Sequence, residues 1–245
     1  GSARLDGCEA GHGRHDRVTV PVRLGPGVRS IPDGPACPHP VEFDFTVFDA
    51  ARYAGTEGYC AGDCELSRAM LEQGCWEPWQ TSLAVDILSR RPERAVLDLG
   101  SHCGWYSMLG LVSGHAVWAL DADVEHAAVC VENAASARLD DRLTVAVGWL
   151  DGDSEPLQPH EVGPVRLAKV DVEGAEGDAA RVLAPLLDAR LVDYALVEMS
   201  PEFGDGWRMA VKIFADAGYT GHLLADKGDD VERFEALPLV STLAG

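Results

Sequence analysis

The sequence predicts an α/β protein in which a mostly parallel β-sheet is covered by helices on both faces. Two observations predict it. From Trp76 onward, short apolar segments alternate with segments whose apolar residues recur at helical spacing. One apolar segment also stops abruptly at an acidic residue and a glycine and then opens into a helix, in the stretch VLDLGSHCGWYS. Strict alternation is typical of parallel sheets, because each return to a parallel strand needs a crossover connection, usually a helix.

Seven strands are expected in this part of the chain. They are the ranges 95–97, 115–120, 143–147, 165–172, 194–199, 219–224 and 234–239. One helix is expected to start at Pro78, which suits a first helical turn, and a second to be capped by Asp123. A third follows Gly174 and is expected to be broken into two pieces by Pro185, and a fourth is closed by Gly218.

Residues 1–75 differ in amino-acid composition from the rest of the chain. They are rich in Gly, Pro and Cys, and they contain two stretches of alternating apolar residues, 18–22 and 41–48. A period of two predicts two short strands, which a hairpin can join. We therefore divide the chain into an N-terminal extension or cap with short strands, residues 1–75, and a main domain, residues 76–245.

The charge of the chain excludes some classes of partner. There are 20 basic and 40 acidic residues, which gives a net charge of −20. Nucleic acids and anionic membrane surfaces attract clustered Lys and Arg, so neither is expected as a partner. No run approaches the roughly 18 apolar residues of a membrane span. A small molecule is the expected partner, and a homo-oligomer is an open alternative to a monomer.

The seven cysteines show no regular spacing, which favours a reducing compartment, the cytoplasm. Cys103 and Cys130 lie in apolar segments and are expected in the core. Cys60 and Cys64, with Cys75 and His39 nearby in the sequence, leave a zinc site open as an alternative, although no established ligand spacing is present.

The turn in VLDLGSHCGWYS is expected to hold a ligand. In parallel sheets, ligands bind beyond the carboxyl ends of the strands, where the chain turns into helices. Gly100 and Gly104 let the backbone approach a ligand closely, and the helix that follows presents N–H groups. The next strand ends at Asp121, 23 residues after Asp98, about the separation at which a carboxylate binds ribose hydroxyls. The turn therefore predicts a nucleoside site.

The absence of one glycine motif from this turn argues against a dinucleotide as the ligand. A dinucleotide-binding dehydrogenase carries G-x-G-x-x-G, whereas His102 stands here where the middle glycine would be. A nicotinamide-dependent oxidoreductase is therefore the alternative and not the main prediction. His102 is more typical of a residue that orients the backbone of the turn than of a general base.

Four segments together resemble the FkbM family of S-adenosylmethionine-dependent methyltransferases. They are CWEPWQT, DLGSHCGWYS, ALDAD and KVDVEGAE. The resemblance implies a Rossmann-like class I methyltransferase fold whose seventh strand is antiparallel. It also implies methyl transfer to a hydroxyl of a small molecule, sugar-like or from natural product biosynthesis. The family commonly has Ala and Asn in place of Ser101 and His102, and often Glu in place of Asp121. A module that binds the cofactor without turnover is a further alternative.

The resemblance places S-adenosylmethionine at the first two strand ends, with Asp121 on its ribose. Glu77 and Gln80, on either side of Pro78, are expected to reach the methionine end. The implied cofactor-binding residues are Glu77, Gln80, Asp98, Gly100, Ser101, His102, Gly104, Asp121 and Ala122.

Asp171, Glu173 and Glu198 are the expected catalytic residues. Asp171 and Glu173 end the fourth strand, where alternation would point both side chains to the same side. Two carboxylates there need a cation, a shared proton or a donor-rich substrate, so Asp171 and Glu173 are also candidate ligands of a Mg2+ ion. Glu198 ends the fifth strand and is expected to bind acceptor hydroxyls. If the pair is only structural, Lys169 neutralises Asp171.

Overall fold

The structure, a computed structural model, describes residues 17–24, 41–48 and 61–222, without the side chains of 61–65. Five strands of this part form one parallel sheet. In chain order they are β3 (Ala95–Leu99), β4 (Val117–Asp121), β5 (Leu143–Val147), β6 (Val165–Val170) and β7 (Val192–Val197). Their order across the sheet is β5-β4-β3-β6-β7, which places β3 at the centre. The prediction of a parallel α/β sheet is confirmed.

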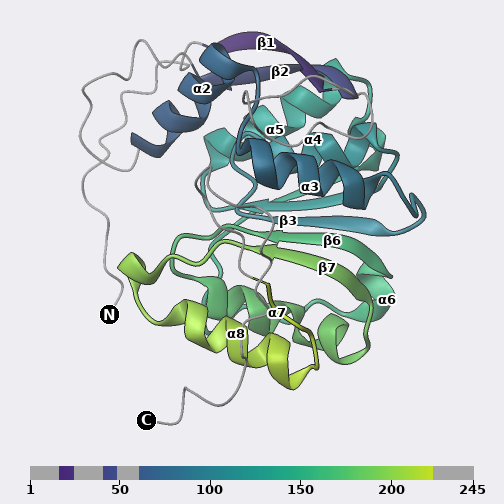
Figure 1. Ribbon diagram of the computed structural model, residues 1–245, viewed down its shortest axis with the longest axis vertical. Helices are drawn as coiled ribbons and strands as arrows, with labels where there is room; N and C mark the ends of the chain where they lie inside the picture. Colours follow the sequence, from purple (N-terminus) through teal and green to yellow (C-terminus); the bar gives the residue numbers. More distant parts are fainter. Residues whose placement is uncertain (1–16, 25–40, 49–60, 223–245) are drawn as a thin grey trace.

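Helices cover both faces of the sheet. The longer ones are α3 (Pro78–Leu88), α4 (Trp105–Val112), α5 (Val124–Ser136), α7 (Glu176–Asp188) and α8 (Gly206–Asp216), and the short ones are η1 (Asp140–Arg142), α6 (Pro159–Val162) and η2 (Pro201–Phe203). α3, α4 and α5 lie on one face, and α7 and α8 lie on the other (Figure 1). Every residue of β3 and β6 is buried between these two layers. Within the described part of the chain, no helix is long and apolar enough to cross a membrane.

Five of the seven expected strands are present, and the other two fall at the end of the described residues. Residues 219–222 form no strand apart from an isolated bridge at His222. The rest of the expected strand 219–224, and all of 234–239, lie outside the described residues.

Helix α7 is not broken at Pro185, contrary to the expectation. It runs without interruption from Glu176 to Asp188. Proline lacks the N–H that would bond the carbonyl four residues earlier, but Pro185 stands in the last turn, so the bond is lost only near the helix end. Buried leucines on both sides of it, Leu183 and Leu187 among them, hold the helix against the sheet.

The N-terminal extension contributes two strands, as predicted. β1 (Arg17–Leu24) and β2 (Val41–Phe48) pair antiparallel over their whole lengths. They are followed by α2 (Ala61–Gln73), a helix that the glycine- and cysteine-rich composition of this segment did not predict.

The two strands share one hydrophobic core with the main domain. Phe43 and Phe45 of β2 pack against Trp105 of α4, with ring centroids 5.8 and 5.2 Å apart. Fully buried Asn133 of α5 adds a polar link, because its Oδ1 accepts a hydrogen bond from the N–H of Thr46 at 2.6 Å. Its Nδ2 donates to the carbonyls of Thr46 and Cys103, at 3.1 and 2.9 Å.

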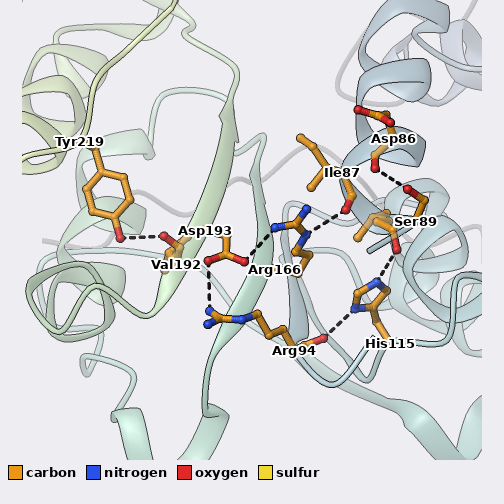
Figure 2. A network of polar contacts seen from close by, with 10 residues as sticks. Asp86, Ile87, Ser89, Arg94, His115, Arg166, Val192, Asp193 and Tyr219 are labelled. Carbon is orange, nitrogen blue, oxygen red and sulfur yellow. Dashed lines mark hydrogen bonds and ion pairs between the residues drawn. The ribbon is translucent and has the colours of Figure 1, made fainter. Parts of the chain in front are cut away.

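A second polar network fixes the opposite edge of the sheet, where the strands begin (Figure 2). Arg166 of β6 and Arg94, just before β3, both form ion pairs with Asp193 of β7, at 2.9 and 3.1 Å. Arg166 also donates from Nε to the carbonyl of Ile87 in α3 at 2.9 Å. The two ring nitrogens of buried His115 contact main-chain carbonyls at 2.7 and 2.8 Å. This network holds the amino ends of the strands together.

Asn133→Ala should lower the free energy of unfolding by about 2–4 kcal/mol, because it leaves buried main-chain groups of Thr46 and Cys103 without their partner. Urea denaturation followed by circular dichroism measures this loss. Val131→Ala, at a residue of the same helix that is 44% exposed, is the control and should change stability by less than about 0.5 kcal/mol. A loss no larger than that of the control would show that the docking of β2 does not depend on Asn133.

Candidate functional site

The carboxyl ends of the strands bring together polar residues that lie far apart in the sequence. The turn 100–104 follows β3, Asp121 ends β4, Asp171 follows β6 and Glu198 follows β7. In a parallel sheet these ends share one edge, where ligands bind. The side chains fall into two groups, one around Asp121 and one around Asp171.

The two glycines of the β3–α4 turn are required by contacts within the protein. Gly100 has φ +81°, and a Cβ added there would lie 1.6 Å from the carbonyl oxygen of Asp171. Gly104 has φ +83°, and its added Cβ would lie 2.5 Å from Sγ of Cys130. Both positions therefore exclude a side chain. The sequence predicted a close approach of the backbone to a ligand, and the structure places protein atoms against these two Cα positions.

Asp98 is buried beneath the turn, with 1% of its surface exposed. Its Oδ2 accepts hydrogen bonds from the main-chain N–H of Ser107 at 2.8 Å and from the Ser107 hydroxyl at 2.5 Å. Burial raises the pKa of Asp98 to about 6, against the lowering effect of the Ser107 hydrogen bonds and the Lys169 charge. Asp98, predicted to bind the cofactor, thus ties the end of β3 to the first turn of α4.

Asp121 is also buried, but its carboxylate lies beside the turn. Oδ2 accepts from the N–H of His102 at 2.6 Å, and Oδ1 accepts from the N–H of Asp123 at 2.8 Å. Nδ1 of His126 lies 3.2 Å from Oδ1. Burial acts to raise the pKa of Asp121, but the hydrogen bond and charge of His126, with the two main-chain N–H groups, lower it overall. The carboxylate is therefore ionised, and it organises the turn through His102.

His126 is a member of this group that the sequence did not predict. It lies in the first turn of α5, which begins after the predicted cap Asp123; the Asp123 side chain accepts from the N–H of Glu125 at 2.7 Å. The rings of His126 and His102 stack, with centroids 4.0 Å apart and planes inclined by 31°. The sequence offered one signal for His126, namely its position in the first turn of the helix that follows Asp121, the acid at the end of a strand.

Around Asp171, three carboxylates meet. One oxygen each of Glu77, Asp171 and Glu198 lies within 4.8 Å of the other two, and this is the one such group of potential metal ligands in the described residues. Nζ of Lys169 stands among them, 3.1 Å from Asp171, 3.5 Å from Glu198 and 3.8 Å from Glu77. We call these four residues the Lys169 cluster. It contains two of the three predicted catalytic residues.

Glu77 reaches this cluster because of the unusual start of α3. It has φ +43°, a left-handed conformation, directly before Pro78, which disfavours a right-handed helical residue at this position. The N–H of Thr81 donates to the Glu77 carbonyl at 2.8 Å, which holds the turn. The Tyr106 hydroxyl, from the β3–α4 side, donates to Oε2 of Glu77. Glu77 was expected at the cofactor, and the structure places it with Asp171 and Glu198.

Glu173 is not part of the Lys169 cluster, and the strand geometry on which its expected pairing with Asp171 was based is absent. The strand β6 ends at Val170, two residues earlier than predicted, and Glu173 lies in a turn with φ +47°. The period-two alternation of an extended strand therefore does not apply beyond Val170. Partial burial and the nearby charge of Asp171 raise the pKa of Glu173.

Glu198 is the most exposed member of the cluster, with 46% of its side chain accessible. Partial burial and the Asp171 charge raise its pKa to about 7, whereas Lys169 acts in the opposite direction. A carboxylate with such a pKa is divided between its two protonation states near neutral pH, which suits a group that accepts a proton.

The remaining predicted residues lie close to these two groups along the chain. Ser101 is buried, and its main-chain N–H donates to the carbonyl of Leu120 in β4 at 3.0 Å. Its hydroxyl has no hydrogen-bond partner among the described residues. Gln80 in α3 and Ala122 after β4 are both half-buried.

No protein-family model matches the chain, and no curated protein sequence matches it. Similar solved structures include a TehB-like SAM-dependent methyltransferase from Corynebacterium glutamicum, with 17% identity, a TM-score of 0.42 and coverage of 67% of this chain and 82% of that chain. Geranyl diphosphate C-methyltransferase from Streptomyces coelicolor has 16% identity and a TM-score of 0.43, with 71% and 72% covered. A SAM-dependent methyltransferase from Geobacter sulfurreducens has 22% identity and a TM-score of 0.34, with 49% and 47% covered. At these identities and TM-scores the similarity does not identify the function of this chain.

Asp98→Asn should become more stable relative to the wild type as the pH rises from about 4 to above 6. Folding raises the pKa of Asp98 from 3.8 to about 6, so the wild type loses stability over this interval while the neutral variant does not. About two pH units correspond to roughly 2–3 kcal/mol. Urea unfolding of both proteins at a series of pH values measures the difference, in which the other titrating groups cancel. A difference that stays constant with pH would contradict the assignment of a raised pKa to Asp98.

Proposed function

We propose that the protein is an S-adenosylmethionine-dependent methyltransferase that methylates a hydroxyl of a small molecule, sugar-like or natural-product in character. The observation that carries the proposal is the position of Asp121 and the Lys169 cluster on one sheet edge, beside the β3–α4 turn. An acid that can hold a ribose thus lies on the same sheet edge as a group that can accept the proton of an acceptor hydroxyl. The resemblance of DLGSHCGWYS and KVDVEGAE to the FkbM family supports the same activity.

The residues around Asp121 suit a ribose. A carboxylate offers about four acceptor sites, and three of those of Asp121 are taken by His102, Asp123 and His126. One site on Oδ2 remains for a ribose hydroxyl, and a second becomes available if His126 turns away. The buried Ser101 hydroxyl, without a partner in the described part of the chain, can donate to the same ligand. His102 and Ala122 would line this side of the cofactor, and Gln80 its methionine end.

Bound there, S-adenosylmethionine would supply a methyl group activated by a sulfonium. The protein then has to align the acceptor hydroxyl and take up its proton. Glu198 would accept this proton, because it is the accessible carboxylate of the cluster and its pKa is about 7. Asp171, held at 3.1 Å by Lys169, would accept a hydrogen bond from the hydroxyl and orient it.

The proposal is tested by incubating the protein with S-adenosylmethionine and a library of hydroxylated acceptors, with methylated products detected by mass spectrometry. A methylated product supports it. Binding of S-adenosylhomocysteine without any product would favour the non-catalytic module, and binding of NAD(H) would favour the oxidoreductase.

Asp121→Ala should weaken the binding of S-adenosylhomocysteine by about ten- to a hundredfold, because charge-assisted hydrogen bonds to the ribose contribute roughly 1.5–3 kcal/mol. Calorimetry measures the affinity. Asp123→Ala is a matched control, because Asp123 caps α5. This substitution should lower the free energy of unfolding by about 0.5–2 kcal/mol and leave the affinity for S-adenosylhomocysteine unchanged. An Asp121→Ala variant that is folded and binds as tightly as the wild type would rule out the ribose assignment.

Glu198→Gln should reduce the rate of methyl transfer by about a hundred- to ten-thousandfold, because it removes the proton acceptor. The wild-type rate should fall as the pH drops below about 7, where Glu198 becomes protonated, and the residual rate of the variant should not follow this profile. Exposed Glu202, in η2, provides the control Glu202→Gln, which should retain full activity. Rates are measured on the acceptor identified from the library. Wild-type activity in Glu198→Gln, with a loss in Glu173→Gln instead, would restore the pair expected from the sequence.

A further inference from the structure

Lys169 is a buried cation enclosed by carboxylates. Only 4% of its surface is exposed, although lysine is rarely buried without a partner. It lies in β6, next to the centre of the sheet, and its ammonium meets Asp171, Glu198 and Glu77 at 3.1, 3.5 and 3.8 Å. Nζ also lies 5.0 Å from the centroid of the Tyr106 ring, a cation–π distance. The three carboxylates and the aromatic ring at these distances all attract a positive charge.

The same three carboxylates have the spacing of a cation site. Their nearest oxygens lie within 4.8 Å of one another, and hard divalent cations bind such oxygens at about 2.0–2.6 Å. An ion in contact with all three oxygens would stand directly beside the Lys169 ammonium. Two positive charges at such a separation repel strongly in a site that is partly shielded from water.

We propose that the ammonium of Lys169 takes the place of a divalent cation in this cluster, so that the three carboxylates are held together without a bound metal. This replaces the expectation of a Mg2+ ion on Asp171 and Glu173. The role of Lys169 is to position the carboxylates and to neutralise part of their charge. It follows from the geometry of the cluster alone and does not depend on the proposed methyl transfer.

The charge state of Lys169 supports this role. Burial acts to lower its pKa, but the charges of Asp171, Glu77 and Glu198 outweigh burial and raise the pKa above its ordinary value. The ammonium is therefore charged at neutral pH. Removing it leaves three close carboxylates without a counter-charge, and such a group gains stability from protons or from a metal ion.

The test measures cation binding in the absence of cofactor and acceptor, so its failure is distinct from a failure of the proposed function. Tb3+ is the probe, because it is a hard cation and a nearby tyrosine such as Tyr106 sensitises its emission. Lys169→Met removes the ammonium and keeps most of the apolar stem. The double variant Lys169→Met/Glu198→Gln, which lacks one ligand, is its matched control. We expect Lys169→Met to bind Tb3+ about tenfold or more tightly than this control, because affinity at such sites follows the number of charged ligands. Mg2+ should compete with Tb3+ for the same site.

The unmodified cluster gives the second measurement. Wild type and Glu198→Gln should bind Tb3+ equally, because the Lys169 ammonium occupies the cluster in both proteins. Subtracting the binding of one from that of the other removes the contribution of the acidic surface, which the two proteins share. Tighter binding by the wild type than by Glu198→Gln overturns the proposal. So does a folded Lys169→Met that binds no more tightly than its control. If circular dichroism shows that Lys169→Met does not fold, Lys169→Gln with its own Glu198→Gln partner takes its place.

Discussion

The close contact between Gly100 and the main chain of Asp171 is the constraint on which the two halves of the site depend. No side chain fits at residue 100, because its Cβ would lie 1.6 Å from the Asp171 carbonyl oxygen. The N–H of Asp171 in turn donates to the carbonyl of Leu99 at 2.8 Å. The turn that contacts Asp121 through His102 and the Asp171 segment after β6 are thus joined through the main chain. Reactions that need two bound groups in line require such a fixed separation.

Charges buried in the sheet set the electrostatics of this edge. Asp98 in β3 and Lys169 in β6 are neighbours in the register of the two strands. Burial raises the pKa of Asp98, and the Lys169 charge offsets part of this rise, while the carboxylates of the Lys169 cluster keep Lys169 protonated. Burying either charge alone would be strongly unfavourable. The central strands and the site are therefore coupled, because the ammonium that lies in the core also serves the carboxylates at the rim.

Local pattern allowed part of this structure to be predicted. The presence of five strands, the turn after β3, the Asp123 cap and the position of Asp121 depend on short-range periodicity and spacing, and these features were predicted. The contact of Lys169 with Asp171 was an alternative that the sequence offered. The place of Glu77 in the Lys169 cluster could not be predicted, because Glu77 joins Asp171 only through the strand order and its own left-handed conformation before Pro78. The expected arrangement of Glu173 beside Asp171 assumed strand alternation beyond Val170, where the strand ends. Gly100 was recognised from the sequence, but the contact that requires a glycine there is with Asp171, which lies far along the chain.

The two halves of the site also draw on different parts of the fold. The Lys169 cluster is built by the start of α3 and the ends of β6 and β7. The Asp121 group depends on α5, and through α5 on the N-terminal strands, because the Phe48 ring of β2 lies 5.9 Å from that of His126. Asn133 adds a second route, since it bonds β2 and the turn residue Cys103 at once. A shift of β2 would therefore reach Asp121 through α5, while the carboxylates around Lys169 have separate supports in α3, β6 and β7.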